Sequence, residues 1–213
     1  MIILISGKQG SGKTTLARAL IKKINEQPGV YAQNMTFAEP LYTFHDFIWG
    51  YLQDHGIEKK HVKDGYLLQL LGTEWGRDKV DPFIWAKLLK ARVEKHKNTQ
   101  GKLYSKTYYI VSDCRFKNEF DAFGTDGVMT VRLYCNKDVR MKRAEMWRET
   151  DNHPSETDLD IYAEAGQFDC YYNTEVESVD SIVENVLLWA NQKEKITQLN
   201  KELKREHAAS PTT

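Results

Sequence analysis

A glycine-rich loop near the start of the chain offers the clearest chemistry, because it follows the pattern G-x-x-x-x-G-K-[ST] without a mismatch. Glycines let backbone N–H groups turn inward around phosphate oxygens, and a helix that begins near Lys13 adds its positive N-terminal end. Lys13 would then reach the β- and γ-phosphates of ATP, and Thr14 would hold Mg²⁺ through its hydroxyl. The expected ATP-binding residues are Gly7, Lys8, Gln9, Gly10, Ser11, Gly12, Lys13, Thr14 and Thr15.

A carboxylate at the end of an apolar run is the second candidate. Residues 109–111 read Tyr-Ile-Val, and Asp113 follows them. In proteins with a phosphate loop, such an aspartate lies beside the loop and orders the Mg²⁺ shell; the alternative is an aspartate that caps the next turn. Arg115, Asn118 and Glu119 come directly afterwards, and ligands bind at the carboxyl ends of parallel strands. We therefore expect Asp113 to be a catalytic and metal-binding residue.

A helix expected over residues 137–149 is rich in arginine. Arg140 and Arg143 are three residues apart and share one face of it. They could close over the triphosphate and neutralise charge on the transferred group, since the guanidinium fork binds phosphate oxygens bidentately. The alternative is a solvated helix whose own glutamates pair with these arginines.

A second basic stretch is the one feature that could support nucleic-acid binding. No aromatic residue interleaves with its cations before Tyr104, so no stacking platform is apparent, and a solvated helix and loop is the favoured interpretation. The stretch comprises Lys87, Lys90, Arg92, Lys95, Lys97, Lys102 and Lys106. The whole chain balances 30 basic against 30 acidic residues, which gives no general attraction to nucleic acid or anionic membranes.

The elements that must position these residues alternate between strands and helices. Strands are expected at residues 2–6, 30–37, 108–111, 128–134 and 170–173, and helices after residue 13 and from residue 179 to about 205. Residues 40–100 form a mainly helical insertion between the second and third strands, with one apolar stripe at Leu41, Phe44, Phe47 and Ile48. This order predicts an α/β fold, a parallel sheet with helices on both faces, and an acceptor pocket in the insertion.

The bulk composition is typical of one soluble domain. The chain has 213 residues, of which 41% are hydrophobic, enough for one sizeable core. Its three cysteines are far apart and lack metal-ligand spacing, which indicates reduced thiols in a cytoplasmic protein. No run of 18 apolar residues is present, so we expect no membrane span.

With these residues in view, the chain resembles the phage deoxynucleoside monophosphate kinases, within the nucleoside monophosphate kinase group. The most specific block is LLQLLGTEWGR at 67–77, followed by DPFIW at 81–85. Further blocks are the phosphate loop at 7–15, FAEPL at 37–41, DCRFKNE at 113–119 and HPSE at 153–156, with Leu159-Asp160. The likeness runs from Met1 to about Trp189.

The resemblance implies a three-layer fold with a five-stranded parallel sheet, an acceptor-binding helical region and a mobile lid. The kinase domain would cover 1–190, with the acceptor region at 38–100 and the lid at 137–157; residues 191–213 would be a helical extension and tail. The resemblance also implies that Arg77 grips the phosphate of the acceptor. The expected acceptor-binding residues are Arg77, Glu39, Trp75, Arg115, Glu119, His153 and Glu156.

Three of these roles have alternatives. Trp75 could stack on a base or belong to the core, because an aromatic beside a leucine-rich helix is at least as often core. His153 could contact phosphate or sugar, or cap a turn. Glu156 could hold an arginine of the lid in place.

The leading interpretation is ATP-dependent phosphorylation of deoxynucleoside monophosphates, with Mg²⁺ as cofactor and the cytoplasm (the host's, for a phage protein) as location. One alternative is a kinase for another small phosphate ester, such as those acting on phosphomevalonate or dephospho-coenzyme A. The other is a P-loop ATPase that acts on nucleic acid; the charge balance and the Arg77 block argue against it. Ile196, Leu199 and Leu203 of the terminal helix could serve packing or a homodimer.

Overall fold

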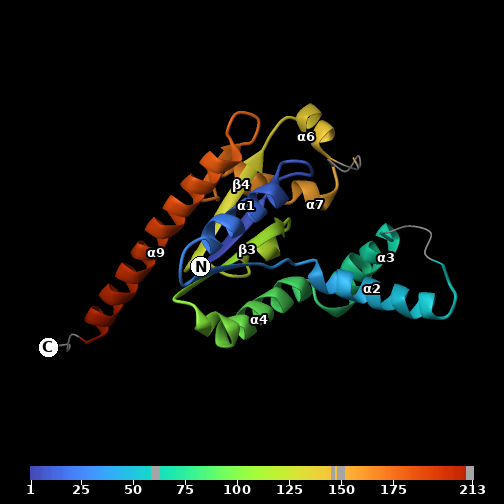
Figure 1. The fold of residues 1–213 in the computed structure, drawn as a ribbon, viewed down its shortest axis with the longest axis horizontal. Coiled ribbons are helices and arrows are strands. Elements are labelled where there is room, and N and C mark those ends of the chain that lie inside the picture. Colours follow the sequence, from blue (N-terminus) through green and yellow to red (C-terminus); the bar gives the residue numbers. More distant parts are fainter. Residues whose placement is uncertain (59–62, 145–146, 148–151, 210–213) are drawn as a thin grey trace.

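The computed structural model describes residues 1–58, 63–144, 147 and 152–209, with side chains as far as Arg205 (Figure 1). Its centre is a sheet of five parallel strands in the order β2-β3-β1-β4-β5. The strands are β1 (Ile2–Ser6), β2 (Val30–Asn34), β3 (Lys106–Cys114), β4 (Val128–Tyr134) and β5 (Cys170–Asn173). The predicted α/β fold is confirmed, although β2 ends three residues before the expected 37 and β3 is longer than predicted.

Helices cover both faces of the sheet, because alternate side chains of each buried strand point to opposite sides. Ile3 and Ile5 of β1 pack with α1 (Lys13–Asn25) and α9 (Val179–Ala209) in one core cluster. Ile2 and Leu4 pack on the other face, in a cluster that includes Leu89 of α4 (Ile84–Asn98). The phosphate loop, residues Gly7–Thr14, therefore joins a buried strand to a helix whose apolar side is held on the sheet.

The predicted helical insertion lies between β2 and β3. It contains α2 (Glu39–Asp54), α3 (Gly65–Gln69), the π-helix η1 (Leu70–Val80) and α4, followed by the short 3₁₀ helix η2 (Gln100–Leu103). The α2 and α3 helices project away from the sheet (Figure 1). The apolar stripe of α2 is consequently covered only in part: Leu41 packs against the core, whereas Phe44 and Phe47 are exposed. Among the described residues of α2, the one fully buried is His45.

The segment after β4 differs from the helix predicted over residues 137–149. The helix α6 (Lys137–Arg143) ends at Arg143, because Ala144 adopts an extended backbone conformation. Residues 145–146 and 148–151 of the expected lid lie outside the described residues. The short helices α7 (Pro154–Thr157) and α8 (Asp160–Glu164) then lead to β5, and α5 (Lys117–Asp121) follows β3.

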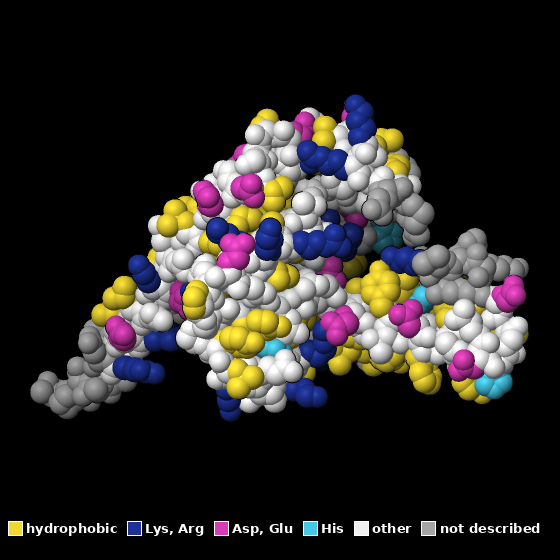
Figure 2. Space-filling view, in the orientation of Figure 1, with side chains coloured by type: hydrophobic (Ala, Val, Ile, Leu, Met, Phe, Trp, Pro, Cys, Tyr) yellow, Lys and Arg dark blue, Asp and Glu magenta, His cyan; other side chains and the backbone are white. Residues whose placement is uncertain are grey.

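The basic stretch is largely neutralised by carboxylates. Ion pairs join Lys87 to Asp81, Arg92 to Glu39, Lys97 to Glu94 and Lys106 to Glu194. Figure 2 shows positive and negative side chains interspersed over the surface. This arrangement agrees with the solvated interpretation of the stretch. In the part of the chain that the structure describes, no helix combines the length and apolar character needed to span a membrane.

Candidate active site

The phosphate loop takes a conformation that only glycine accommodates easily. Gly10 and Gly12 have positive φ angles of 77° and 94°. A Cβ atom at Gly10 would also come within 2.5 Å of the backbone oxygen of Arg140. The loop and α6 are thus packed backbone to backbone, and Gly12 is the residue from which α1 begins. Glycine here is required by both backbone angle and close approach.

Lys13 is buried at the start of α1 and donates to two carbonyl oxygens of its own loop. Its Nζ lies 2.6 Å from the Gly7 oxygen and 2.8 Å from the Lys8 oxygen. Burial is the main cause that lowers the pKa of Lys13 to about 7. Nearby guanidinium groups, Arg115 most of all, also lower it, whereas the carboxylate of Glu156 raises it. An anion such as a phosphate would relieve this electrostatic cost.

A large cleft of about 1020 Å³ opens beside the loop. Its walls come from the phosphate loop and α1, the segment after β2, α2, η1, the end of β3, and α6. The lining includes Gln9, Gly10, Gly12, Lys13, Thr14, Thr15, Arg18, Asn34, Leu41, Tyr42, Arg77, Trp85, Asp113, Arg115, Phe116, Glu119 and Arg143. We call this cavity the main cleft. It brings the predicted phosphate-binding lysine and the predicted acceptor arginine into one site.

Asp113 lies at the carboxyl end of β3, beside the phosphate loop, as expected. Its two carboxylate oxygens accept hydrogen bonds from the backbone N–H groups of Phe37 (3.1 Å) and Ala38 (3.0 Å). Burial raises the pKa of this carboxyl group, whereas these two hydrogen bonds lower it. Asp113 therefore ties the segment after β2 to the sheet, in addition to the metal role predicted for it.

The donor set fits a Mg²⁺ ion that arrives with its nucleotide. Among the described residues, no three His, Cys, Asp or Glu side chains gather to form a metal site of their own. Mg²⁺ usually needs only one or two protein oxygens, because phosphates and water complete its shell. The exposed hydroxyl of Thr14 at the edge of the main cleft and the carboxylate of Asp113 are suitable groups.

Arg77 is held rigidly in the wall of the main cleft. Its guanidinium donates to Glu119 Oε1 (3.0 Å) and to the Gly72 oxygen (2.9 Å), and it stacks over the Phe116 ring at 4.3 Å. Glu119 is buried, and its other oxygen accepts from the backbone N–H groups of Arg115 and Phe116. Burial raises the pKa of Glu119 to about 7, although these hydrogen bonds and the charge of Arg77 lower it. Two of the five N–H donors of Arg77 are thus used to fix it.

Glu156 reaches the phosphate loop from α7. Its Oε2 accepts a hydrogen bond of 2.6 Å from the Gln9 backbone N–H, and its Oε1 pairs with Arg115. Arg115 also donates to the Ser155 oxygen (3.3 Å). Glu156 does hold an arginine, but one from the end of β3. A buried carboxylate here occupies donors that a phosphate oxygen would also use.

The two arginines of α6 lie on different sides of the loop. Arg140 is buried, donates to the Gln9 oxygen (3.3 Å) and lies over the Trp147 ring. Arg143 is exposed, lines the main cleft and donates to both the hydroxyl (2.9 Å) and the carbonyl (2.8 Å) of Thr174, after β5. Their predicted contact with the triphosphate stays a prediction.

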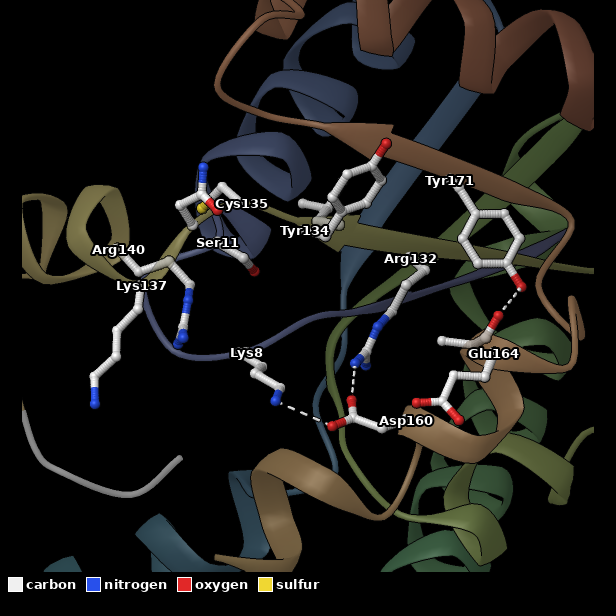
Figure 3. Close-up of a pocket in the computed structure, with 13 residues that line it drawn as sticks. Lys8, Ser11, Arg132, Tyr134, Cys135, Lys137, Arg140, Asp160, Glu164 and Tyr171 are labelled. Atoms are coloured by element: carbon white, nitrogen blue, oxygen red, sulfur yellow. Dashed lines mark hydrogen bonds and ion pairs between the residues drawn. The ribbon is translucent and has the colours of Figure 1, made fainter. Parts of the chain in front are cut away.

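A second cavity of about 590 Å³, which we call the side cavity, opens elsewhere around the loop (Figure 3). Lys8 and Arg132 both point to Asp160 of α8; the Lys8–Asp160 pair measures 3.0 Å. Arg132 also donates to Ser6 at the end of β1. Lys8 and Ser11, predicted to bind ATP, line this cavity and not the main cleft, and the side chain of Lys8 braces the loop against α8.

Four predicted acceptor residues are absent from the lining of the main cleft, among them Glu156, whose contacts are described above. Glu39 pairs with Arg92 at the surface, and Trp75 of η1 packs edge-on against Phe44 of α2. His153 is the N-cap of α7, where its ring accepts from the Ser155 backbone N–H (3.2 Å). The N-cap contact favours the structural alternative for His153, whereas Trp75 is 44% exposed and does not belong to the core.

Sequence reasoning missed the part played by Arg132 and Thr174. A charged residue within the apolar run of β4 is a signal that could have revealed Arg132, since arginine is rarely buried without a partner. No local signal marks Thr174, whose hydroxyl donates to the Ser11 oxygen (3.2 Å) across the chain.

Comparisons with known proteins support the fold. No protein-family model matches the chain, and no curated protein sequence matches it. Its structure is similar to a gluconokinase from Sinorhizobium meliloti 1021, with a TM-score of 0.52 and 12% identity, covering 93% of this chain and 95% of the other. At this identity, the likeness shows a shared fold.

Two further solved structures resemble the chain more weakly, with TM-scores below 0.5. A shikimate kinase from Acinetobacter baumannii in complex with shikimate has 11% identity and a TM-score of 0.48, covering 87% of this chain and 90% of that one. A deoxyadenosine kinase from M. mycoides has 14% identity and a TM-score of 0.40, covering 90% and 100%.

Proposed function

We propose that this protein transfers the γ-phosphoryl group of ATP to a small phosphorylated acceptor, a deoxynucleoside monophosphate. The observation that carries the proposal is the main cleft, which is lined by the phosphate loop and by the rigid Arg77. The fold shared with a gluconokinase is compatible with phosphoryl transfer. Two anion-binding elements in one cavity are what a donor triphosphate and a phosphate acceptor require.

The donor would bind at the start of α1. Loop N–H groups and Lys13 would contact the β- and γ-phosphates, for which Lys13 would exchange its carbonyl partners for phosphate oxygens. Mg²⁺, held by Thr14 with Asp113 nearby, would neutralise charge on the β- and γ-oxygens. Catalysis would then rest on positioning and charge stabilisation, to which Arg115 and Arg143 of the cleft wall contribute.

The acceptor would bind against η1 and α2. Arg77 keeps donors beyond the two that fix it, so it can orient a phosphate group. Leu41, Tyr42 and Trp85 supply a partly apolar wall suited to a base. The choice of a deoxynucleoside monophosphate over another phosphate ester rests on the sequence resemblance.

A coupled assay with each deoxynucleoside and ribonucleoside monophosphate, and with other small phosphate esters, tests the proposal. We expect ATP-dependent diphosphate formation with at least one deoxynucleoside monophosphate and none with the unphosphorylated nucleosides. ATP hydrolysis that polynucleotides stimulate, without transfer to any small acceptor, would overturn it.

Arg77→Lys tests the acceptor subsite, because lysine keeps the charge but cannot give two parallel hydrogen bonds. We expect a higher acceptor KM and lower turnover, a loss on the order of 2 kcal/mol in acceptor kcat/KM, with the KM for ATP nearly unchanged. The matched control is Arg92→Lys, at an arginine that pairs with Glu39 outside the cleft. Equal damage to both substrate constants would show that Arg77 acts through folding.

A further inference from the structure

The terminal helix α9 packs on the sheet along only its first half. Ile182, Val183, Val186 and Ala190 are buried in the core beside α1. The last polar contacts with the body are the pairs of Lys193 with Asp169 and of Glu194 with Lys106. Among the described side chains, those from Lys195 to Arg205 make no hydrogen bond or ion pair outside α9. Figure 1 shows this half extending away from the body.

A second apolar stripe runs along another side of α9. Leu188, Trp189, Ile196, Leu199 and Leu203 are exposed by 49 to 58%. Successive residues turn by about 100° around a helix, so these five share one side, roughly 120° around the helix from the side that Val186 and Ala190 present to the core. Figure 2 shows hydrophobic side chains on the projecting part of the helix. The helix is therefore apolar on two sides, and the chain itself covers one.

The spacing of this stripe is that of a helix-pairing seam. Trp189, Ile196 and Leu203 repeat every seven residues, and Leu199 follows Ile196 by three, as in a heptad with apolar a and d positions. Such a seam needs a partner helix.

The charged residues beside the stripe favour a second copy of this chain as the partner. Lys195 and Glu202 flank the stripe on the same side, seven residues apart, and both are exposed. In an antiparallel pair of identical helices, Lys195 of one copy lies opposite Glu202 of the other, twice by symmetry. A parallel pair would not bring these two opposite charges together.

We propose that the projecting half of α9 pairs antiparallel with the same segment of a second copy, through Ile196, Leu199 and Leu203, to form a homodimer. This inference does not depend on the proposed activity. Sedimentation or light scattering of the full chain across a wide range of protein concentration should give twice the 24.7 kDa chain mass, with dissociation on dilution.

The double variant Ile196→Gln, Leu199→Gln removes the seam while keeping good helix-forming residues. We expect it to be monomeric with unchanged core stability. The control is Lys201→Gln, an exposed position on the other side of the same helix, which should stay dimeric. Dimerisation of the double variant, or a monomeric wild type at every concentration, would overturn the proposal.

Charge exchange tests the orientation. Lys195→Glu and Glu202→Lys should each weaken the dimer severalfold, and the double exchange should restore it. Residues seven apart in one helix are too distant to pair with each other, so restoration requires a second copy. Failure to restore would overturn the antiparallel arrangement. Vesicles with anionic lipids provide the competing outcome: monomeric protein that binds them through the same residues would assign the stripe to a membrane surface.

Discussion

Lys13 is an ammonium group whose charge is opposed by burial and by neighbouring guanidinium groups, which is why its pKa lies near 7. Bound phosphates favour the charged form, so they raise the pKa of Lys13 in the complex. Above pH 7, Lys13 is neutral in an increasing fraction of the free protein. Nucleotide binding must then be accompanied by uptake of a proton from solution. The affinity for nucleotide should consequently fall as pH rises above about 7.

The measurement is calorimetry of a non-hydrolysable ATP analogue at pH 8, in buffers with different ionisation enthalpies. We expect uptake of up to about one proton per molecule bound. Lys13→Met cannot titrate and should lose this uptake. A heat of binding that is the same in all buffers would show that Lys13 is already protonated at this pH.

Glu156 presents a negative charge where a phosphate is expected, since it accepts from Gln9 and pairs with Arg115. Glu156→Gln keeps a hydrogen-bond acceptor but removes the charge. We expect tighter nucleotide binding, by on the order of 1 kcal/mol, because the repulsion disappears and Arg115 is released. Fluorescence titration with the same analogue measures it.

The control for this prediction is Glu164→Gln, an exposed carboxylate lining the side cavity, which should leave nucleotide affinity unchanged. Weaker binding by Glu156→Gln would mean that Glu156 acts by positioning Arg115 for the phosphate.

At the scale of elements, η1 is the piece that presents Arg77. Its π-helical turns allow the Trp85 ring to lie against its backbone, where the indole donates to the Gly72 oxygen (2.8 Å). A Cβ at Gly76 would come within 2.4 Å of that ring and 2.7 Å of the Leu71 oxygen. Glycine is therefore required next to Arg77, and π-helical segments are frequent at functional sites.

Gly76→Ala should destabilise the protein by about 1–3 kcal/mol through overpacking and raise the acceptor KM more than the KM for ATP. Denaturant unfolding and two saturation curves measure these effects. Gly50→Ala is the control, because a Cβ there meets nothing within 4 Å; it should be neutral or stabilise α2 by about 0.5–1 kcal/mol. Full stability of Gly76→Ala would show that η1 can shift freely.

At the scale of the whole molecule, the sheet and its two helical layers are separable from the projecting half of α9. The core contacts of that helix end at Ala190, and its last ion pair with the body is at Glu194. A chain that ends at Glu194 should keep its fold, and its kcat/KM should stay within about twofold of the full chain. Kinetics and thermal unfolding test this. Loss of the fold would mean that the projecting half contributes to the core.

The sequence by itself determined the elements whose causes are local. The phosphate loop was recognisable because glycine spacing, a buried strand and a following helix are adjacent in the chain, and β1 was located by its uninterrupted apolar run. The apolar stripe of α2 did not predict its burial. Apolar spacing shows that a helix has an apolar side, but not whether the sheet lies near enough to cover that side.

Only the tertiary structure decided which residues of the site contact one another. Asp113 binds backbone N–H groups 75 and 76 residues away, Arg77 pairs with Glu119 at a separation of 42, and Glu156 meets Gln9 at a separation of 147. None of these contacts follows from spacing along the chain, because each depends on which strand ends lie side by side in the sheet. The parallel sheet, in the order β2-β3-β1-β4-β5, brings the carboxyl ends of its strands to one edge. The buried charged side chains named above form their hydrogen bonds and ion pairs there.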